Sequence, residues 1–278
     1  MTSDKTFDEH LEYVRQMVRL ELWFIRHWLA GHPEEGFPHV IRQRTGIYLK
    51  SDVYDGGPFK QIAWADPRWL ELEGRAQELL TRARGDADSS RFEEEGLAIF
   101  LPSLEARARA DFAKGVDRTP ASQCGSLRYD PPKPETPQRA PFHIGNAVRP
   151  RSIFDDPEYL PRCLLCLMNK SEREYRCDSL STTTWLNSYP RWLAIFPPEW
   201  MENLGPEMTA PTAGMGFWGQ FVSARGTFNG KHARMLRETG RFPFWPRPSW
   251  CAFEMLREHI ARRWPGLVGI DQTVERAE

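Results

Sequence analysis

The sequence lacks the features that mark membrane proteins and nucleic-acid-binding proteins. No apolar run approaches the roughly 20 residues that span a bilayer. The 37 Lys and Arg residues are balanced by 38 Asp and Glu residues, for a net charge of -1, so the chain as a whole has no electrostatic attraction to nucleic acid or to an anionic membrane. We therefore expect a soluble protein whose partners include neither nucleic acid nor a membrane.

The sequence also shows no pattern typical of a disulfide framework, a secretory signal or a common enzyme motif. An odd number of cysteines, five in 278 residues, argues against a disulfide framework and favours reduced thiols. The first residues include acidic ones where a secretory signal would be basic and then apolar, so we expect a cytoplasmic protein. Neither a Walker motif nor a serine in a nucleophile elbow is found, which argues against a P-loop NTPase and an α/β-hydrolase.

Helical periodicity and helix caps are present instead. Apolar residues recur every three or four positions over residues 7–30, as on the buried face of a helix. Asp66 as N-cap and Pro67 at the first helical position predict a second helix, which ends at Gly85. A capping box opens a third predicted helix over residues 90–115.

The second half of the chain continues this pattern. Further helices are predicted over residues 156–176, as short pieces within 191–205, over 217–239 and over 249–264. The best strand candidate, residues 39–57, lacks clean alternation and gives at most one short hairpin. The predicted fold class is therefore all-α, with six to eight helices in a compact bundle-like domain.

Proline marks the predicted internal boundary. Residues 117–141 contain six prolines and few apolar residues, which is typical of extended surface chain. We expect a single helical domain over residues 1–278, with an N-terminal helical half (1–116), this surface connection and a C-terminal half (142–278) that carries a pocket.

The segment 217–239 carries the strongest indication of a site. As one helix it would place Arg225, Asn229 and His232 on the same face as Trp218. Polar groups buried without partners are costly, so these side chains either find internal partners or line a ligand pocket. In the second case Trp218 and Asn229 contact the substrate, Arg225 holds an anionic group, and His232 acts as acid or base.

Two other stretches supply candidates for the same pocket. His143 and Asn146 lie in a Gly-containing loop that leads to Asp155, so we assign His143 and Asp155 to acid–base catalysis and Asn146 to substrate binding. Trp185 and Asn187 lie in a stretch rich in hydroxyl and aromatic side chains, which suits a wall that stacks on a flat ligand.

These candidates predict an enzyme that transforms a small organic molecule in an aromatic-lined helical pocket, with the cofactor unknown and a homo-oligomer left open. The first alternative is a haem or non-haem metal enzyme that recruits the same histidines, with Glu21 on the first helix as a further carboxylate. No second cysteine pair accompanies Cys163 and Cys166, so we interpret these two as core residues rather than zinc ligands. The second alternative is a non-catalytic helical module that binds a ligand or a partner protein.

Overall fold

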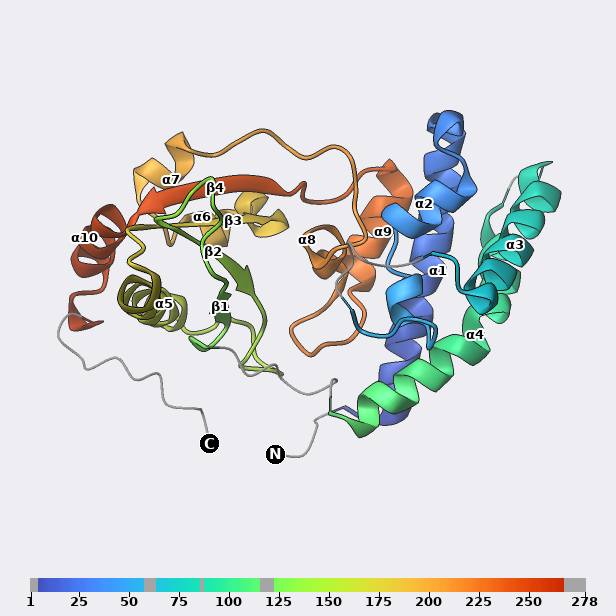
Figure 1. Ribbon diagram of the computed structural model, residues 1–278, viewed down its shortest axis with the longest axis horizontal. Coiled ribbons are helices and arrows are strands. Elements are labelled where there is room, and N and C mark those ends of the chain that lie inside the picture. Colours follow the sequence, from blue (N-terminus) through green and yellow to red (C-terminus); the bar gives the residue numbers. More distant parts are fainter. Residues whose placement is uncertain (1–4, 58–63, 86–87, 116–122, 268–278) are drawn as a thin grey trace. The chain divides into compact units, whose positions relative to one another are not determined.

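The computed structural model describes residues 5–57, 64–85, 88–115 and 123–267, which contain ten α-helices and a four-stranded mixed sheet (Figure 1). The α-helices are α1 (Phe7–Gly31), α2 (Phe37–Gln43), α3 (Pro67–Arg82), α4 (Ser90–Ala113), α5 (Tyr159–Tyr175), α6 (Pro190–Leu193), α7 (Pro198–Glu202), α8 (Met215–Trp218), α9 (Gly230–Thr239) and α10 (Phe253–Arg263). The strands are β1 (Leu127–Tyr129), β2 (Arg139–Ile144), β3 (Ser179–Thr184) and β4 (Arg247–Ala252). Short 3-10 helices occupy Pro33–Glu35, Tyr48–Lys50, Ala83–Gly85, Trp185–Ser188, Gly219–Phe221 and Pro265–Leu267.

The sheet shows that the all-α prediction is wrong. Its strands are three to six residues long, so each contributes too few inward apolar residues for a visible alternation. β3 reads SLSTTT, and β4 begins with Arg-Pro-Ser. The predicted helix from residue 249 starts only at Phe253, because residues 247–252 pair with β3. The candidate hairpin at 39–57 is also wrong, since this segment contains most of α2 and the 3-10 helix Tyr48–Lys50.

None of the helices in the described ranges has both the length and the apolar character required to cross a bilayer.

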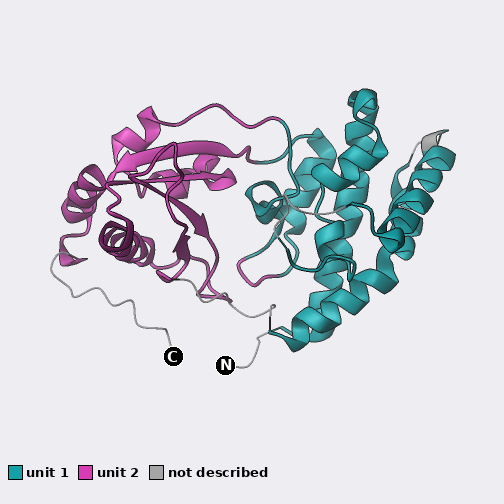
Figure 2. Ribbon diagram, viewed as in Figure 1, with its two compact units in different colours: residues 1–118, 210–223, 227–243 teal, residues 119–209, 224–226, 244–278 magenta. Residues whose placement is uncertain are grey.

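The chain divides into two compact units, each built from several separate segments of the sequence (Figure 2). Unit 1 consists of residues 1–118, 210–223 and 227–243, and unit 2 consists of residues 119–209, 224–226 and 244–278.

Unit 1 is helical, and local sequence signals define its main helices. α1 begins at a capping box in which the Thr6 side chain accepts a hydrogen bond from the Glu9 N–H at 3.2 Å and the Glu9 carboxylate accepts one from the Thr6 N–H at 2.8 Å. Asp66 caps α3 by accepting from the Arg68 N–H at 2.8 Å. Both helix starts confirm the prediction. α4 also continues through Pro102, as predicted, but the predicted capping box at its start is wrong, because its N-cap is Ser89 and makes no side-chain capping bond.

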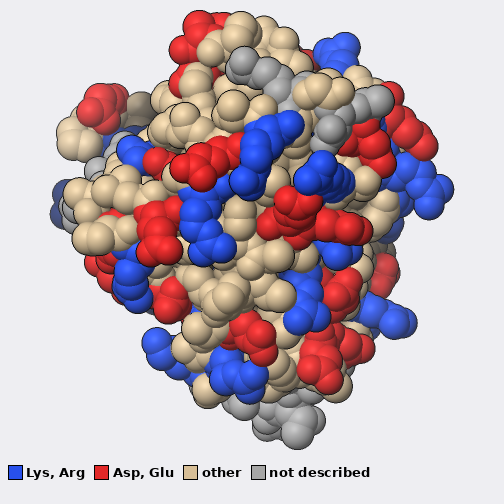
Figure 3. Space-filling model, turned by 90° about the vertical axis from the view of Figure 1, so that its right-hand side faces the viewer, with Lys and Arg blue, Asp and Glu red and all other residues tan. Residues whose placement is uncertain are grey.

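Partly buried ion pairs join helices of unit 1. The Arg42 guanidinium donates to both oxygens of Glu73 on α3, at 2.7 and 2.6 Å. Arg237 on α9 makes the same bidentate contact with Glu93 on α4, at 2.8 and 2.6 Å. Exposed helix faces carry i,i+4 pairs such as Arg91 with Glu95. On the face shown in Figure 3, basic and acidic side chains are accordingly interspersed.

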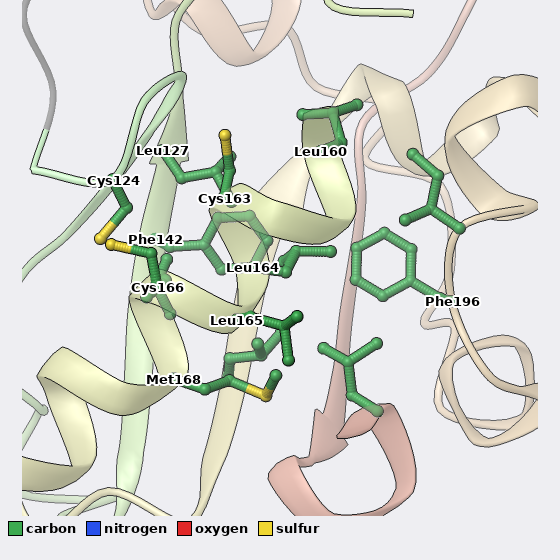
Figure 4. Close-up of a cluster of buried hydrophobic side chains, with 14 of the residues drawn as sticks. Cys124, Leu127, Phe142, Leu160, Cys163, Leu164, Leu165, Cys166, Met168 and Phe196 are labelled. Carbon is green, nitrogen blue, oxygen red and sulfur yellow. The ribbon is translucent and has the colours of Figure 1, made fainter. Parts of the chain in front are cut away.

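Unit 2 is built on the sheet, whose strands lie in the order β1-β2-β3-β4. β1 is antiparallel to β2, β2 is parallel to β3, and β3 is antiparallel to β4. α5 forms the crossover between the two parallel strands, as a parallel connection requires. The inward side chains of the strands, among them Phe142, Leu180 and Cys251, are buried. They pack with the apolar side of α5 in one core cluster, part of which is drawn in Figure 4.

The opposite side of this sheet carries a different set of side chains. Because successive residues of a strand point to opposite faces, Arg139, Pro141 and His143 of β2 share one face, and Ser181 and Trp250 extend it across β3 and β4. These five residues are half-buried or exposed, whereas the inward residues between them on β2, Ala140 and Phe142, are buried. We call this side of the sheet the outer face of unit 2.

Candidate functional site

The outer face of unit 2 places an imidazole and a carboxylate in direct contact. His143 Nε2 lies 2.7 Å from Asp130 Oδ2, and the two side chains are 57% and 44% exposed. Asp130 follows β1 directly, and its N–H donates to the Pro141 carbonyl at 3.0 Å, which fixes the carboxylate beside β2. Because an ionised carboxylate only accepts, His143 Nε2 carries the proton in this bond, and Nδ1 is the ring nitrogen that exchanges a proton with another molecule.

An arginine lies on the same face, four residues earlier on β2. The Arg139 guanidinium carbon lies 4.0 Å from the centroid of the Trp250 ring, so the cation stacks on the aromatic face. Arg139 Nε is buried and has no hydrogen-bond partner among the described residues. No carboxylate in the described part of the chain comes within ion-pair distance of Arg139, whereas most buried arginine nitrogens in proteins are paired.

Arg139 also forms one wall of a hollow of about 560 Å³. The hollow lies where β2, β3 and α10 begin, and its polar lining includes Arg139, Glu172, Asp178, Ser179, Glu254 and Arg257. Backbone bonds hold these three starts together, since the Asp178 N–H donates to the Gln138 carbonyl at 2.9 Å and the Asp178 carbonyl accepts from the Phe253 N–H at 2.7 Å. The volume is within the range of pockets that hold small organic ligands.

The charges in the hollow are of both signs, and only some of them are paired. Arg257 donates to Glu172 at 2.5 Å. Asp178 and Glu254 are exposed, and neither has an ion-pair partner among the described residues. The hollow therefore combines one stacked cation with carboxylates that remain open to a ligand.

Three of the sequence-predicted site residues, Trp218, Asn229 and His232, belong to unit 1. The single helix predicted to carry them together with Arg225 is not continuous. α8 ends at Trp218, a 3-10 helix follows, and α9 begins only at Gly230. Gly226 between them has a φ of 76°, a left-handed conformation that interrupts a helix and favours glycine. The prediction that Arg225, Asn229 and His232 share one helical face is therefore wrong.

Asn229 and His232 nevertheless meet at one backbone carbonyl. Asn229 is the N-cap of α9 and accepts from the His232 N–H at 3.3 Å. Its Nδ2 donates to the Gln220 carbonyl at 3.1 Å, and His232 Nδ1 donates to the same oxygen at 2.8 Å. Burial lowers the pKa of His232, and its bond to this carbonyl opposes that shift. Trp218 is buried in the aromatic core of unit 1, and its indole N–H donates to the Arg44 carbonyl at 3.0 Å.

The remaining predicted residues lie in unit 2. Asn187 is fully buried, where its amide donates to the Thr182 and Arg247 carbonyls at 3.1 and 2.7 Å and its oxygen accepts from the Trp192 indole at 2.9 Å. These contacts give Asn187 a structural role that the sequence does not reveal.

Asn146, Asp155, Trp185 and Arg225 each lie in a loop or a short 3-10 helix. Asn146 donates to the Arg151 and Ala224 carbonyls at 2.8 and 3.0 Å. Asp155 accepts from the Ser152 N–H at 2.9 Å in an exposed turn. Trp185 packs against Phe244, with their ring centroids 5.8 Å apart, and Arg225 is exposed. Of all the predicted residues, His143 is the one on the outer face.

Comparison of the chain with protein-family models, with curated proteins and with solved structures gives no match. The site therefore has to be interpreted from its own chemistry.

Metal binding was the first alternative predicted from the sequence. Among the described residues, no group of three or more His, Cys, Asp and Glu side chains is arranged to hold a metal ion. Glu21, the carboxylate named for that role, is fully buried and accepts from the Lys50 ammonium at 2.8 Å and from the Gly46 N–H at 2.9 Å. Cys163 and Cys166 lie in the unit 2 core, as interpreted from the sequence.

Three residues of the site were missed by sequence analysis. Arg139 and Trp250 lie on strands that were not predicted, so their common face was not visible. Asp130 lies in the proline-rich stretch that we interpreted as surface chain. The available signal was the period of two in residues 139–144, where Ala140 and Phe142 alternate with Arg139, Pro141 and His143.

Proposed function

We propose that unit 2 is an enzyme that transforms a small organic anion on the outer face of its sheet. The observation that carries this proposal is the arrangement on β2, where Arg139 and the Asp130-bound His143 lie on the same exposed face, four residues apart. A strand rises about 3.3 Å per residue, which separates the two Cα atoms by about 13 Å. The substrate is accordingly an extended molecule whose anionic group lies several bonds from the reacting atom.

Each residue has a distinct role. Arg139 binds the anionic group, because its guanidinium is always charged and offers parallel N–H donors that match a carboxylate or a phosphate. Trp250 holds the guanidinium flat and supplies apolar surface beside it. His143 moves the proton at Nδ1, and Asp130 orients the ring through Nε2 and stabilises the imidazolium. We place this activity in the cytoplasm, because all five cysteines are buried free thiols.

The test is a screen for turnover with matched variants. The full chain is incubated with a pool of carboxylates and phosphate esters, and consumption is followed by mass spectrometry. For a consumed compound, we expect His143→Gln to lower kcat about 100-fold or more, since general acid–base catalysis contributes roughly 10²–10⁴-fold. We expect Arg139→Gln to raise KM. His39→Gln, which changes an exposed histidine of unit 1, serves as the control. A wild-type kcat in His143→Gln would refute the assignment.

A non-catalytic binding role for the same unit is the second candidate. It is favoured by the lining of the hollow at Arg139, which includes no histidine. A compound that binds in an Arg139-dependent manner but is never consumed would establish this second role and exclude the first.

A further inference from the structure

The unpaired charges of the hollow indicate the chemical class of its ligand, an inference that rests on the function proposed above. Arg139 on one side and Asp178 and Glu254 on the other line the same hollow, yet no ion pair joins Arg139 to either carboxylate within 4.0 Å in the described part of the chain. A ligand that carries both charges can pair with Arg139 and with a carboxylate of the hollow at the same time.

The positions of these groups are set by backbone structure and not by flexible loops. Arg139 pairs in register with Ser179 on the neighbouring strand, and Asp178 precedes Ser179 directly. Glu254 lies in the first turn of α10, whose first residue is bonded through its N–H to the Asp178 carbonyl. The cation and the carboxylates therefore extend from adjacent, hydrogen-bonded segments, which fixes the backbone positions of the three residues.

A ligand of a single charge sign leaves part of this lining without a partner. A simple anion satisfies Arg139 but lies near two unpaired carboxylates, and like charges at such a site weaken binding. A simple cation satisfies Asp178 and Glu254 but leaves Arg139, with its buried Nε, unpaired. A zwitterion pairs with both sides. Trp250 and Phe253 add apolar surface to the same hollow.

We propose that the hollow binds an amino carboxylate, with the carboxylate on Arg139 and the ammonium group on Asp178 and Glu254. The class includes free amino acids and short peptides, which differ in the separation of their two charges. A hollow of about 560 Å³ has room for either.

The test compares binding of charge-matched probes to the full chain by isothermal titration calorimetry at low salt. The probes are L-phenylalanine, glycyl-L-phenylalanine, N-acetyl-L-phenylalanine and L-phenylalaninamide. We expect a zwitterionic probe to bind about tenfold or more tightly than the N-acetyl and amide compounds, as for the loss of one charge-assisted contact.

Variants assign each charge to its partner. Asp178→Asn should weaken binding of the zwitterion but not of the N-acetyl compound, which loses a like-charged neighbour and should bind equally or more tightly. Arg139→Gln should weaken binding of both and should not weaken binding of the amide. Arg173→Gln, an exposed arginine of α5 outside the hollow, is the control, and circular dichroism verifies the fold of every variant.

The outcomes separate this inference from the proposed function. Equal affinity for the zwitterion and the N-acetyl compound, with Arg139 still required, would overturn the zwitterion and leave the anion site and the catalytic role of His143 standing. No binding of any probe would also overturn the zwitterion. A wild-type kcat in His143→Gln would overturn the catalytic proposal without affecting these affinities.

Discussion

The ion pair between Arg237 and Glu93 gives a quantitative prediction about unit 1. Glu93 is 9% exposed at its side chain, and both of its oxygens accept from Arg237, whose side chain is 35% exposed. We expect Arg237→Met to destabilise the protein substantially. The variant keeps most of the aliphatic bulk of the side chain but leaves a nearly buried carboxylate whose remaining side-chain donor among the described residues is the Ser89 hydroxyl, at 2.7 Å.

The magnitude follows from burial. Removing one partner of a fully buried pair costs about 3–5 kcal/mol. Because the Arg237 side chain is 35% exposed, water reaches the uncovered carboxylate, and we expect a cost below that range, about 2–3 kcal/mol. Arg75→Met is the matched control, since Arg75 pairs with Glu71 on α3 with both side chains exposed. That change should alter stability by less than about 0.5 kcal/mol.

The assay is urea unfolding followed by far-ultraviolet circular dichroism, with the double variant Glu93→Leu/Arg237→Met included. Replacing both members of a buried pair by apolar residues is often neutral, so the double variant should recover most of the stability lost in Arg237→Met. A loss below about 0.5 kcal/mol in Arg237→Met, as for an exposed pair, would refute the reasoning. So would a double variant that is less stable than the single one.

Three further predictions concern buried polar groups and thiols. Asn187→Leu should lower the free energy of unfolding by about 2–3 kcal/mol, because it leaves the Trp192 indole N–H unpaired in the core and removes two further hydrogen bonds to backbone carbonyls. Asn203→Leu, which loses a single bond of 3.2 Å, should cost less than half as much in the same urea titration. Burial lowers the pKa of His232 below its ordinary 6.5, so its contribution to stability is present above pH 6.5 and is lost as the pH falls through the lowered value. His232→Gln should therefore flatten the decline of the unfolding midpoint below pH 6.5, with a residual slope from His259, whose pKa burial also lowers; an unchanged slope would contradict this. All five cysteines are buried, and burial raises the pKa of Cys251. Iodoacetamide should therefore label the native protein slowly and the urea-unfolded protein at all five sites. Labelling of the native thiols at the rate of an exposed cysteine would show that burial is not maintained.

Helices with local signals were predictable from the sequence. The apolar stripe of α1 and the Asp66 cap of α3 are encoded within a few residues of where they act, so no knowledge of the rest of the chain is needed. α5 begins at Tyr159, three residues after the predicted start at residue 156, because Asp156 accepts from the Glu158 N–H in a preceding turn. Such a shift at a helix start is set by turn geometry that periodicity does not detect.

The sheet and most of the site depend on contacts that are distant in sequence. β4 is stabilised by pairing with β3, some 65 residues earlier, and without this pairing its sequence has weak strand propensity. His143 was recognised because an imidazole in a loop has few structural roles. Its partner Asp130 follows another strand and lies 13 residues away in the sequence. Arg139 could not be recognised as a site residue without knowing that it stacks on Trp250, which lies on a distant strand. The predicted helix through Arg225 is interrupted at Gly226, whose left-handed backbone conformation is not visible in the spacing of apolar residues.

The alternation of the chain between its two units sets the order in which they can be completed during synthesis. Residues 210–223 and 227–243 belong to unit 1 although unit 2 intervenes. Until residue 243 has left the ribosome, Phe24 lacks the Trp218 and Phe242 rings that it contacts at 5.5 and 5.7 Å, and Glu93 lacks Arg237. An N-terminal fragment that ends at residue 118 would expose this aromatic surface, so expression of unit 1 by itself requires the later segments to be joined to it.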